Sequence, residues 1–173
     1  MFMRKLFLPF FIVLMQPTFA SNLEGPNLGR PIDKSKIARW NLDVFPDGRG
    51  LPDGTGTAVE GKAIYQSQCQ SCHGFQGTGD SAEELAGAQH TLTDNPPDKT
   101  IGTYWPYATT VFDFIRRSMP IHAPGSLSNN EVYATTAYLL FLNGVIKENT
   151  IINSRTLPSI KMPNRDGFIS LYK

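Results

Sequence analysis

Cys69-Gln70-Ser71-Cys72-His73 is the stretch that decides how this chain folds. It contains the 2 cysteines of the 173-residue sequence, and a histidine follows the second cysteine directly. A disulfide between the cysteines would leave this histidine without a role. A zinc site would need a fourth ligand, which usually comes from a second cysteine pair. The remaining alternatives are a chance arrangement and the covalent attachment of haem.

Haem attachment gives both cysteines and the histidine of the motif a chemical role, and we favour it here. Two thiols on one turn of chain can each add to a vinyl group of the same porphyrin, and the next residue can present its imidazole to the iron. We therefore predict that Cys69 and Cys72 bind haem c and that His73 is an axial iron ligand. A second Cys-x-x-Cys-His motif is absent from the sequence, so we expect one haem.

The second axial ligand is predicted to be Met119. This methionine precedes Pro120 in a predicted loop between two helices. An extended Met-Pro segment can present its thioether sulfur to the iron on the side opposite His73. The alternatives left open by the sequence are Met162, which also precedes a proline, and the loop histidines His90 and His122.

Three stretches carry helix signals. Residues 57–60 and 128–131 each match a capping box, in which a Thr or Ser side chain and a Glu side chain satisfy each other's backbone amides. The first predicted helix runs from residue 57 through the cysteine motif and breaks at Gly74. The second is predicted to begin with Pro106 as its first residue and to end at Met119. The third is predicted to end before Gly144, a typical glycine at the position after a helix.

Residues 74–104 are predicted to be irregular, because glycines and prolines interrupt them repeatedly. So long a loop is unusual in a compact domain unless it wraps around something. A haem is a suitable group for this loop to enclose. Tyr104 and Trp105 lie at the end of this loop. We predict that they line the haem pocket or bond its propionates, with ordinary core packing as the alternative.

The first twenty residues, 1–20, have the layout of a secretory signal peptide. Arg4 and Lys5 precede an apolar stretch, Leu6–Met15, and Ala20 offers a cleavage site. The apolar stretch is about half of the ~20 residues that a membrane span requires. We therefore predict a cleaved signal, export to the periplasm and no membrane span in the mature protein.

The charge of the chain is nearly balanced, with 16 Lys and Arg residues against 15 Asp and Glu residues. The basic residues form no stripe along the sequence. This composition argues against nucleic acid or an anionic membrane surface as the partner.

The placed residues resemble class I cytochrome c over residues 57–144. The resemblance rests on Gly61 and Tyr65, the cysteine motif followed by Gly74, Met119-Pro120 and Tyr138. It implies an all-α fold with three main helices around one covalent haem, in which Gly61 and Tyr65 pack against Tyr138. The expected organisation is a signal peptide at 1–20, an extended N-terminal arm at 21–56, the cytochrome domain at 57–144 and a tail at 145–173 that packs on the domain.

A narrower resemblance covers most of the predicted mature chain. It resembles the cytochrome subunit of Sox-type sulfite or sulfur dehydrogenases in five strings: LGRP (28–31), GLPDGTGTAVEGKAIY (50–65), IGTYWPYATTVFDFIRRSMP (101–120), APGSLSNNEVYATTAYLLFLNG (123–144) and KMPNRDGF (161–168). The family implies a cytochrome that takes electrons from a molybdenum-cofactor subunit. The subunits of that family often have a second haem domain, and this sequence has one haem motif.

The function expected from this resemblance is electron transfer and not catalysis by the chain alone. Single electrons would come from a molybdenum sulfite or sulfur dehydrogenase and leave to a downstream cytochrome or oxidase of the respiratory chain. One alternative is a free soluble shuttle to a terminal oxidase. Another is a haem enzyme or gas sensor with an open iron position, which requires that Met119 does not bind the iron.

Overall fold

The structure is a computed structural model that describes residues 28–37, 40–169 and 171. The predicted signal peptide, 1–20, lies outside the described residues. The chain divides into two units, Met1–Asp33 and Lys34–Lys173. In the described part of the first unit, residues 28–33 are exposed and form neither helix nor strand.

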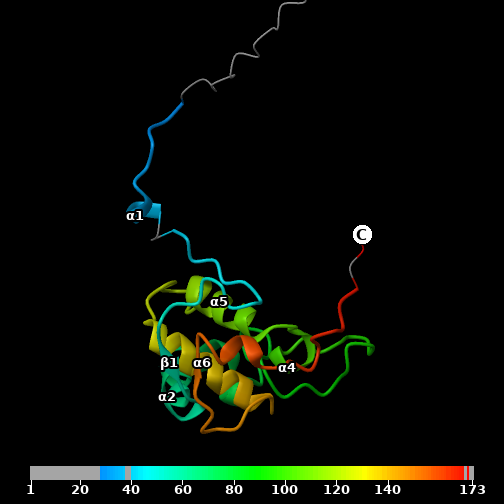
Figure 1. The fold of residues 1–173 in the computed structure, drawn as a ribbon. Coiled ribbons are helices and arrows are strands. Elements are labelled where there is room, and N and C mark those ends of the chain that lie inside the picture. The colour runs from blue at the N-terminus through cyan, green and yellow to red at the C-terminus, as the bar shows by residue number, and fades with distance from the viewer. Residues whose placement is uncertain (1–27, 38–39, 170, 172–173) are drawn as a thin grey trace, which may run out of the picture. The chain divides into compact units, whose positions relative to one another are not determined.

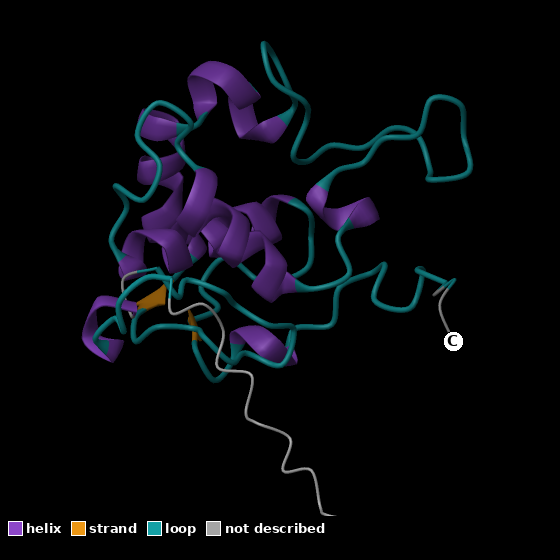
Figure 2. Cartoon of the chain, turned by 90° about the horizontal axis from the view of Figure 1, so that it is seen from above, coloured by secondary structure: helices purple, strands orange, loops and turns teal. Residues whose placement is uncertain are grey.

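The regular secondary structure of the second unit is mainly helical (Figure 1). Its described α-helices are α1 (Lys34–Ile37), α2 (Ala58–Gln68), α3 (Gln70–His73), α4 (Ile101–Tyr104), α5 (Ala108–Ser118) and α6 (Asn129–Leu142). Short 3-10 helices occupy Phe75–Gly77 and Leu157–Ser159. The two described strands, β1 (Thr55–Gly56) and β2 (Ile152–Asn153), form one antiparallel pair in which Gly56 lies opposite Ile152. Figure 2 shows the helices gathered together, with long loops extending from them.

The predicted crossing of the first and last helices of the domain is confirmed. A Cβ atom on Gly61 of α2 would overlap the carbonyl oxygen of Ala134 in α6, so the two backbones meet at this glycine. One turn further along α2, the Tyr65 ring lies 5.3 Å from the Tyr138 ring, measured between centroids. Because both rings are buried, this crossing forms one side of the hydrophobic core.

Both predicted capping boxes are present, and they fix where α2 and α6 begin. The backbone amide of Glu131 donates to the Ser128 hydroxyl, and the Glu131 carboxylate accepts from the Ser128 amide at 2.7 Å. At the other end of α6, Gly144 has a φ of +68°. The amides of Gly144 and Val145 donate to carbonyls of the last turn, which is the hydrogen-bond pattern of a Schellman motif.

Two predicted helix limits are wrong in detail. Cys69 has φ −122° and ψ −36°, so the first helix is divided there into α2 and α3 and does not run unbroken to Gly74. Pro106 is not the first residue of α5, which begins at Ala108 with Tyr107 as its N-cap. Proline disfavours helical geometry in the residue before it, and Trp105 is extended, with a ψ of 123°. Pro106 therefore lies in the bend between α4 and α5.

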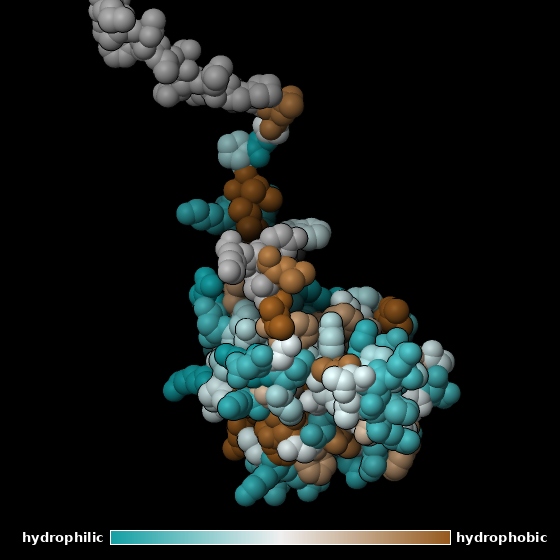
Figure 3. Space-filling model, turned by 90° about the vertical axis from the view of Figure 1, so that its right-hand side faces the viewer, coloured by the Kyte–Doolittle hydropathy of each residue, from teal (hydrophilic) through white to brown (hydrophobic). Residues whose placement is uncertain are grey.

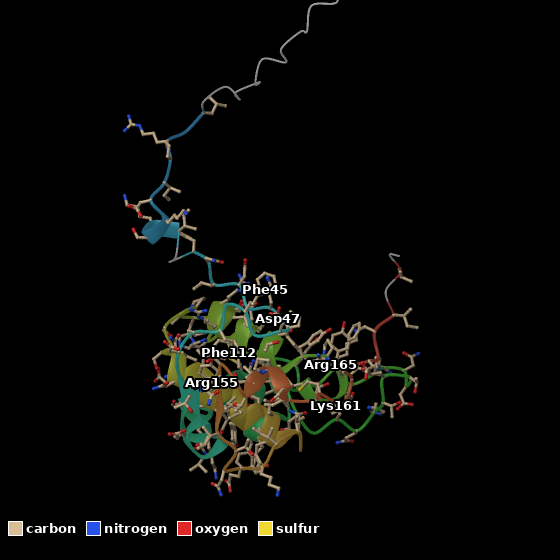
Figure 4. The ribbon with its side chains drawn as sticks, viewed as in Figure 1. Phe45, Asp47, Phe112, Arg155, Lys161 and Arg165 are labelled. Carbon is tan, nitrogen blue, oxygen red and sulfur yellow. The ribbon has the colours of Figure 1, made fainter. Side chains whose placement is uncertain are left out.

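The chain on either side of the helical domain contributes to its packing. Ile152, Leu157 and Met162 after α6 are each 0% exposed and belong to the core. Before the domain, the Val44 amide donates to the Asp113 carboxylate of α5, and Arg117 pairs with both Asp43 and Asp113. Around these anchors, much of the arm is exposed, and Phe45 and Asp47 lie at the edge of the ribbon in Figure 4.

The surface of the second unit mixes polar and apolar residues, as the rounded part of Figure 3 shows for one face. In the part of the chain that the structure describes, no helix combines the length and the hydropathy needed to cross a bilayer.

Candidate haem-binding site

One cavity of about 360 Å³ brings together most of the predicted site. Its volume lies in the range of roughly 300–1,000 Å³ that is typical of cofactor and ligand pockets. Its lining draws on α2, α3, α4, α5, α6 and the loops between them. The predicted site residues among this lining are Cys69, Cys72, His73, Trp105 and Met119.

The two cysteines lie at one wall of this cavity, both half-buried and both as free thiols. The break in the helix at Cys69 turns the chain so that α3 starts immediately after it. Burial raises the pKa of the Cys69 thiol to about 11, and the nearby Cys72 adds to this effect. The Cys69 thiol is therefore protonated at neutral pH, in apolar surroundings that suit a thioether.

The imidazole of His73 has a fixed orientation at the same wall. Its Nδ1 atom lies 3.0 Å from the backbone oxygen of Glu83. A carbonyl oxygen only accepts, so Nδ1 carries a proton, and in the neutral imidazole the lone pair is then on Nε2. Histidine ligands of metals are commonly held in this way, by a hydrogen bond from the other ring nitrogen to a carbonyl.

The loop that follows the motif folds back and forms backbone hydrogen bonds with His73 and Cys72. Gly79 donates its amide to the His73 carbonyl at 2.8 Å, and Ala82 donates to the Cys72 carbonyl at 2.9 Å. The fold-back needs Gly74, which has a φ of +75° and on which a Cβ atom would overlap the backbone of Gly79. The buried Tyr65 hydroxyl donates to the Gly74 carbonyl at 2.9 Å. These contacts attach the loop to the motif although the loop has little regular secondary structure.

Met119 lines the cavity at the end of α5. It is half-buried, and its extended backbone (φ −120°, ψ 146°) ends the helix while its amide still donates to Ile115. His122 also lines the cavity but is exposed. Met162 and His90 are not part of the lining: Met162 is fully buried in the core, and His90 pairs with Asp98.

The two predicted aromatic residues differ in position. Trp105 lines the cavity, and its ring meets that of Phe114 edge to face at a centroid distance of 5.8 Å. Tyr104 is not part of the lining, so its predicted place in the wall of the pocket is not supported, while a bond from Tyr104 to a haem propionate stays a prediction. Its ring lies against Phe168 at 5.4 Å, because the chain becomes extended after α4 and neighbouring side chains then point in different directions.

The sequence analysis missed the role of Glu83 and the contribution of α6 to the cavity. Glu83 acts through its backbone oxygen, for which the sequence has no signal. Thr135 and Leu139 line the cavity one helical turn apart. Their spacing could have indicated a shared face, although it could not show that this face borders a pocket.

The residues present fit a covalently held haem. The cavity combines two thiols, an imidazole with its Nε2 lone pair free, a thioether and mostly apolar walls. The described residues contain no group of three or more His, Cys, Asp or Glu side chains that could hold a metal ion without a porphyrin. The donor set therefore matches a haem better than a bare metal ion.

The comparisons with known proteins agree with this chemistry. The sequence model of the cytochrome c family matches residues 58–143. The crystal structure of the sulfane dehydrogenase SoxCD from Paracoccus pantotrophus contains a chain that is 40% identical, with a TM-score of 0.79, and the match covers 84% of this chain and 72% of that one. This chain belongs to the cytochrome c family. The predicted resemblance to class I cytochromes and to the Sox group is thereby confirmed.

A second relative of this cytochrome is the thiosulfate dehydrogenase of Allochromatium vinosum. It is 32% identical over 117 residues, which are 68% of this chain and 39% of the relative. The cytochrome thus matches about two fifths of the length of that relative.

Proposed function

We propose that this cytochrome carries one haem c, bound by thioethers to Cys69 and Cys72, with His73 and Met119 as axial ligands. The observation that carries the proposal is the meeting of these four side chains at one cavity, with the imidazole already oriented. When bound, the haem supplies a centre that takes up and releases single electrons. The one Cys-x-x-Cys-His motif in the sequence supports a count of one.

The chain's own residues determine what such a centre does. The bond to Glu83 keeps Nε2 of His73 available, and Met119 presents its sulfur where α5 ends. Methionine as the second ligand favours a high reduction potential. Side chains such as Val111, Ile115 and Leu139 make the walls apolar and exclude water. With His73 and Met119 both binding the iron, the site would be suited to electron transfer.

We further propose that the electron donor is a periplasmic molybdenum-cofactor dehydrogenase that oxidises sulfite or another sulfur compound. The similarity to the SoxCD chain supports this, because it covers 84% of the sequence and extends well beyond the haem motif. The thiosulfate dehydrogenase relative supports the same class of substrate. The electrons would pass on to a downstream cytochrome or oxidase, and export would follow from the predicted signal peptide.

Gentle isolation of the native haem protein from periplasm tests the proposed partner. Molybdenum and iron are measured in the haem fraction, with a fraction from cells that lack this gene as the control. A near-stoichiometric molybdenum signal that disappears in the control, and haem reduction on addition of sulfite or thiosulfate, is the expected result. Unchanged formation of reduced cytochrome after removal of every molybdenum enzyme would contradict the proposal and favour a free electron shuttle.

The alternative of an open iron position is tested separately with carbon monoxide. The native reduced protein at neutral pH is expected not to bind carbon monoxide, because Met119 would hold the iron as its second ligand. Binding at neutral pH would instead support a haem enzyme or a gas sensor.

A further inference from the structure

The C-terminal segment 160–168 crosses the link between α4 and α5, and we call it the C-terminal strap. It comprises Ile160 to Phe168, which includes the string KMPNRDGF that haem binding alone does not explain. Its first part is anchored in the core, since Met162 is 0% exposed and Ile160 packs against the core cluster. Figure 4 shows Lys161 and Arg165 on this part of the chain.

A hydrogen bond fixes the strap to the end of α4. The side-chain amide of Asn164 donates to the backbone oxygen of Tyr104 at 2.7 Å, although the two residues are 60 positions apart. Tyr104 is the last residue of α4, and its carbonyl lies next to Trp105 in the chain. A side-chain donor thus supports the carbonyl immediately before Trp105.

Two ring contacts extend this attachment to both sides of Trp105. The guanidinium carbon of Arg165 lies 4.3 Å from the centroid of the Tyr107 ring, which is a cation–π distance. The Phe168 ring meets the Tyr104 ring edge to face, with 5.4 Å between centroids. The strap therefore contacts the residue before Trp105 and the N-cap residue of α5 after it.

Two successive hydrogen-bonded turns give the C-terminal strap its shape. The Arg165 amide donates to the Met162 carbonyl at 3.1 Å, and the Gly167 amide donates to the Asn164 carbonyl at 3.2 Å. A Cβ atom on Gly167 would overlap the Asn164 side chain, so a larger residue at this position would displace that side chain. The turns present Asn164 and Arg165 to α4 and α5 from a base that is fixed by Met162.

The segment that the strap holds has little regular structure of its own. Trp105 is extended, and Pro106 cannot donate a backbone hydrogen bond. The Trp105 ring nevertheless lines the cavity that holds Cys69, Cys72 and His73. A short irregular link of this kind keeps a fixed position only if other parts of the chain support it.

We propose that Asn164 and Arg165 are positioning residues that hold Trp105 as a wall of the haem cavity and so limit the access of water to the haem. The proposal rests on the proposed haem site and adds a determinant of its reduction potential. Looser positioning of Trp105 would admit water and stabilise the more highly charged oxidised state. The strap would then keep the reduction potential high without touching the haem ligands.

The test compares two strap variants with a matched control in the purified haem protein. Asn164→Asp keeps the size and the turn preference of the residue but removes the amide donor, and Arg165→Ala removes the cation from Tyr107. Arg155→Ala is the control, because Arg155 lies in the same tail and is exposed, and its described hydrogen bond comes from its backbone amide to Asn153. Hydrogen exchange of the backbone amides and the reduction potential are measured for each protein.

We expect amide exchange in residues 101–107 to rise at least fivefold in both strap variants, with residues 70–74 unchanged. The reduction equilibrium should shift about threefold toward the oxidised form, which is about 28 mV at 59 mV per tenfold change. Arg165→Lys should restore both values in part, because it returns a cation to Tyr107. The control should match the wild type.

Several results would overturn the proposal. Exchange and potential that stay at wild-type values in both strap variants would show that the strap does not position Trp105. Faster exchange with an unchanged potential would show that it has no effect on the haem, and equal changes in Arg155→Ala would show a general loosening of the tail. A protein without haem would refute the proposed function, while the exchange measurement would still decide whether the strap holds residues 101–107.

Discussion

The Nδ1 atom of His73 lies 3.0 Å from the backbone oxygen of Glu83, ten residues further along the chain. This single contact assigns the proton to Nδ1 and leaves Nε2 able to bind a metal. The acceptor is itself held in place, because the Gly79 and Ala82 amides donate to the carbonyls of His73 and Cys72. The loop 74–86 thus orients the proposed axial ligand.

The first prediction concerns the tautomer of His73. In the reduced, diamagnetic protein, Nδ1 should carry a slowly exchanging proton, because the hydrogen bond to Glu83 protects it. Nitrogen NMR of protein with labelled histidine measures this directly. A Glu83→Ala variant should give the same signal, since the acceptor is a backbone oxygen. An Nδ1 atom without a proton would contradict the orientation described here.

The second prediction separates Met119 from the other candidates for the second axial ligand. Met119→Leu keeps the size of the side chain but removes the sulfur, so the reduced protein should begin to bind carbon monoxide and its potential should fall. Met162→Leu and His122→Ala should change neither property, because Met162 is buried away from the cavity and His122 is exposed. Carbon monoxide binding by Met162→Leu alone would identify Met162 as the ligand.

The third prediction concerns the contact between α2 and α6. Alanine at position 61 is favoured by helix propensity by about 1 kcal/mol, but its Cβ atom would overlap the Ala134 carbonyl. Because the overlap involves backbone, Gly61→Ala should lower the free energy of unfolding by about 2 kcal/mol or more. Urea unfolding measures this loss. The neighbouring Lys62→Ala, at an exposed position, should change the value by less than about 0.5 kcal/mol.

The fourth prediction is a loss of stability at alkaline pH. Burial raises the pKa of Tyr133 from the ordinary 10.0 to about 12. The unfolded chain therefore releases the phenol proton first, so the contribution of Tyr133 to stability is complete below pH 10 and lost as the pH rises through 12. Tyr133→Phe removes this titration, and it also removes the hydrogen bond from the hydroxyl to the Pro52 carbonyl.

Denaturant unfolding at several pH values tests this expectation. Tyr133→Phe should be less stable than the wild type at pH 7, by about 1 kcal/mol for the lost hydrogen bond. Its stability should then fall less steeply between pH 10 and 12, although Tyr65, whose pKa is also raised to about 12, still contributes a decline. An equally steep decline in the variant and the wild type would refute the role given to Tyr133.

The features that could be predicted from the sequence are those with local causes. The capping boxes at Thr57 and Ser128 involve residues three positions apart, so the amino-acid sequence alone locates the starts of α2 and α6. The meeting of Gly61 and Tyr65 with α6 could also be anticipated, from the family resemblance. The cysteine motif could also be recognised from the sequence, because the residues that give it its chemistry are close together in the chain. It identified one wall of the cavity.

The features that could not be predicted depend on backbone angles or on distant parts of the chain. Tyr104 was predicted to lie in the pocket together with Trp105, but the chain is extended at Trp105 and the Tyr104 ring lies against Phe168. The support of His73 comes from a backbone oxygen, which has no residue preference. The contact between Asn164 and Tyr104 joins residues 60 positions apart, so no local sequence pattern predicts it.

The intact mass of the purified protein, measured under denaturing conditions, tests the central claim most directly. The account predicts the mass of the processed polypeptide plus one haem, and the polypeptide mass without haem for a Cys69→Ala/Cys72→Ala variant. A wild-type mass that equals the polypeptide alone, or the polypeptide less two hydrogens as in a Cys69–Cys72 disulfide, would contradict covalent haem attachment.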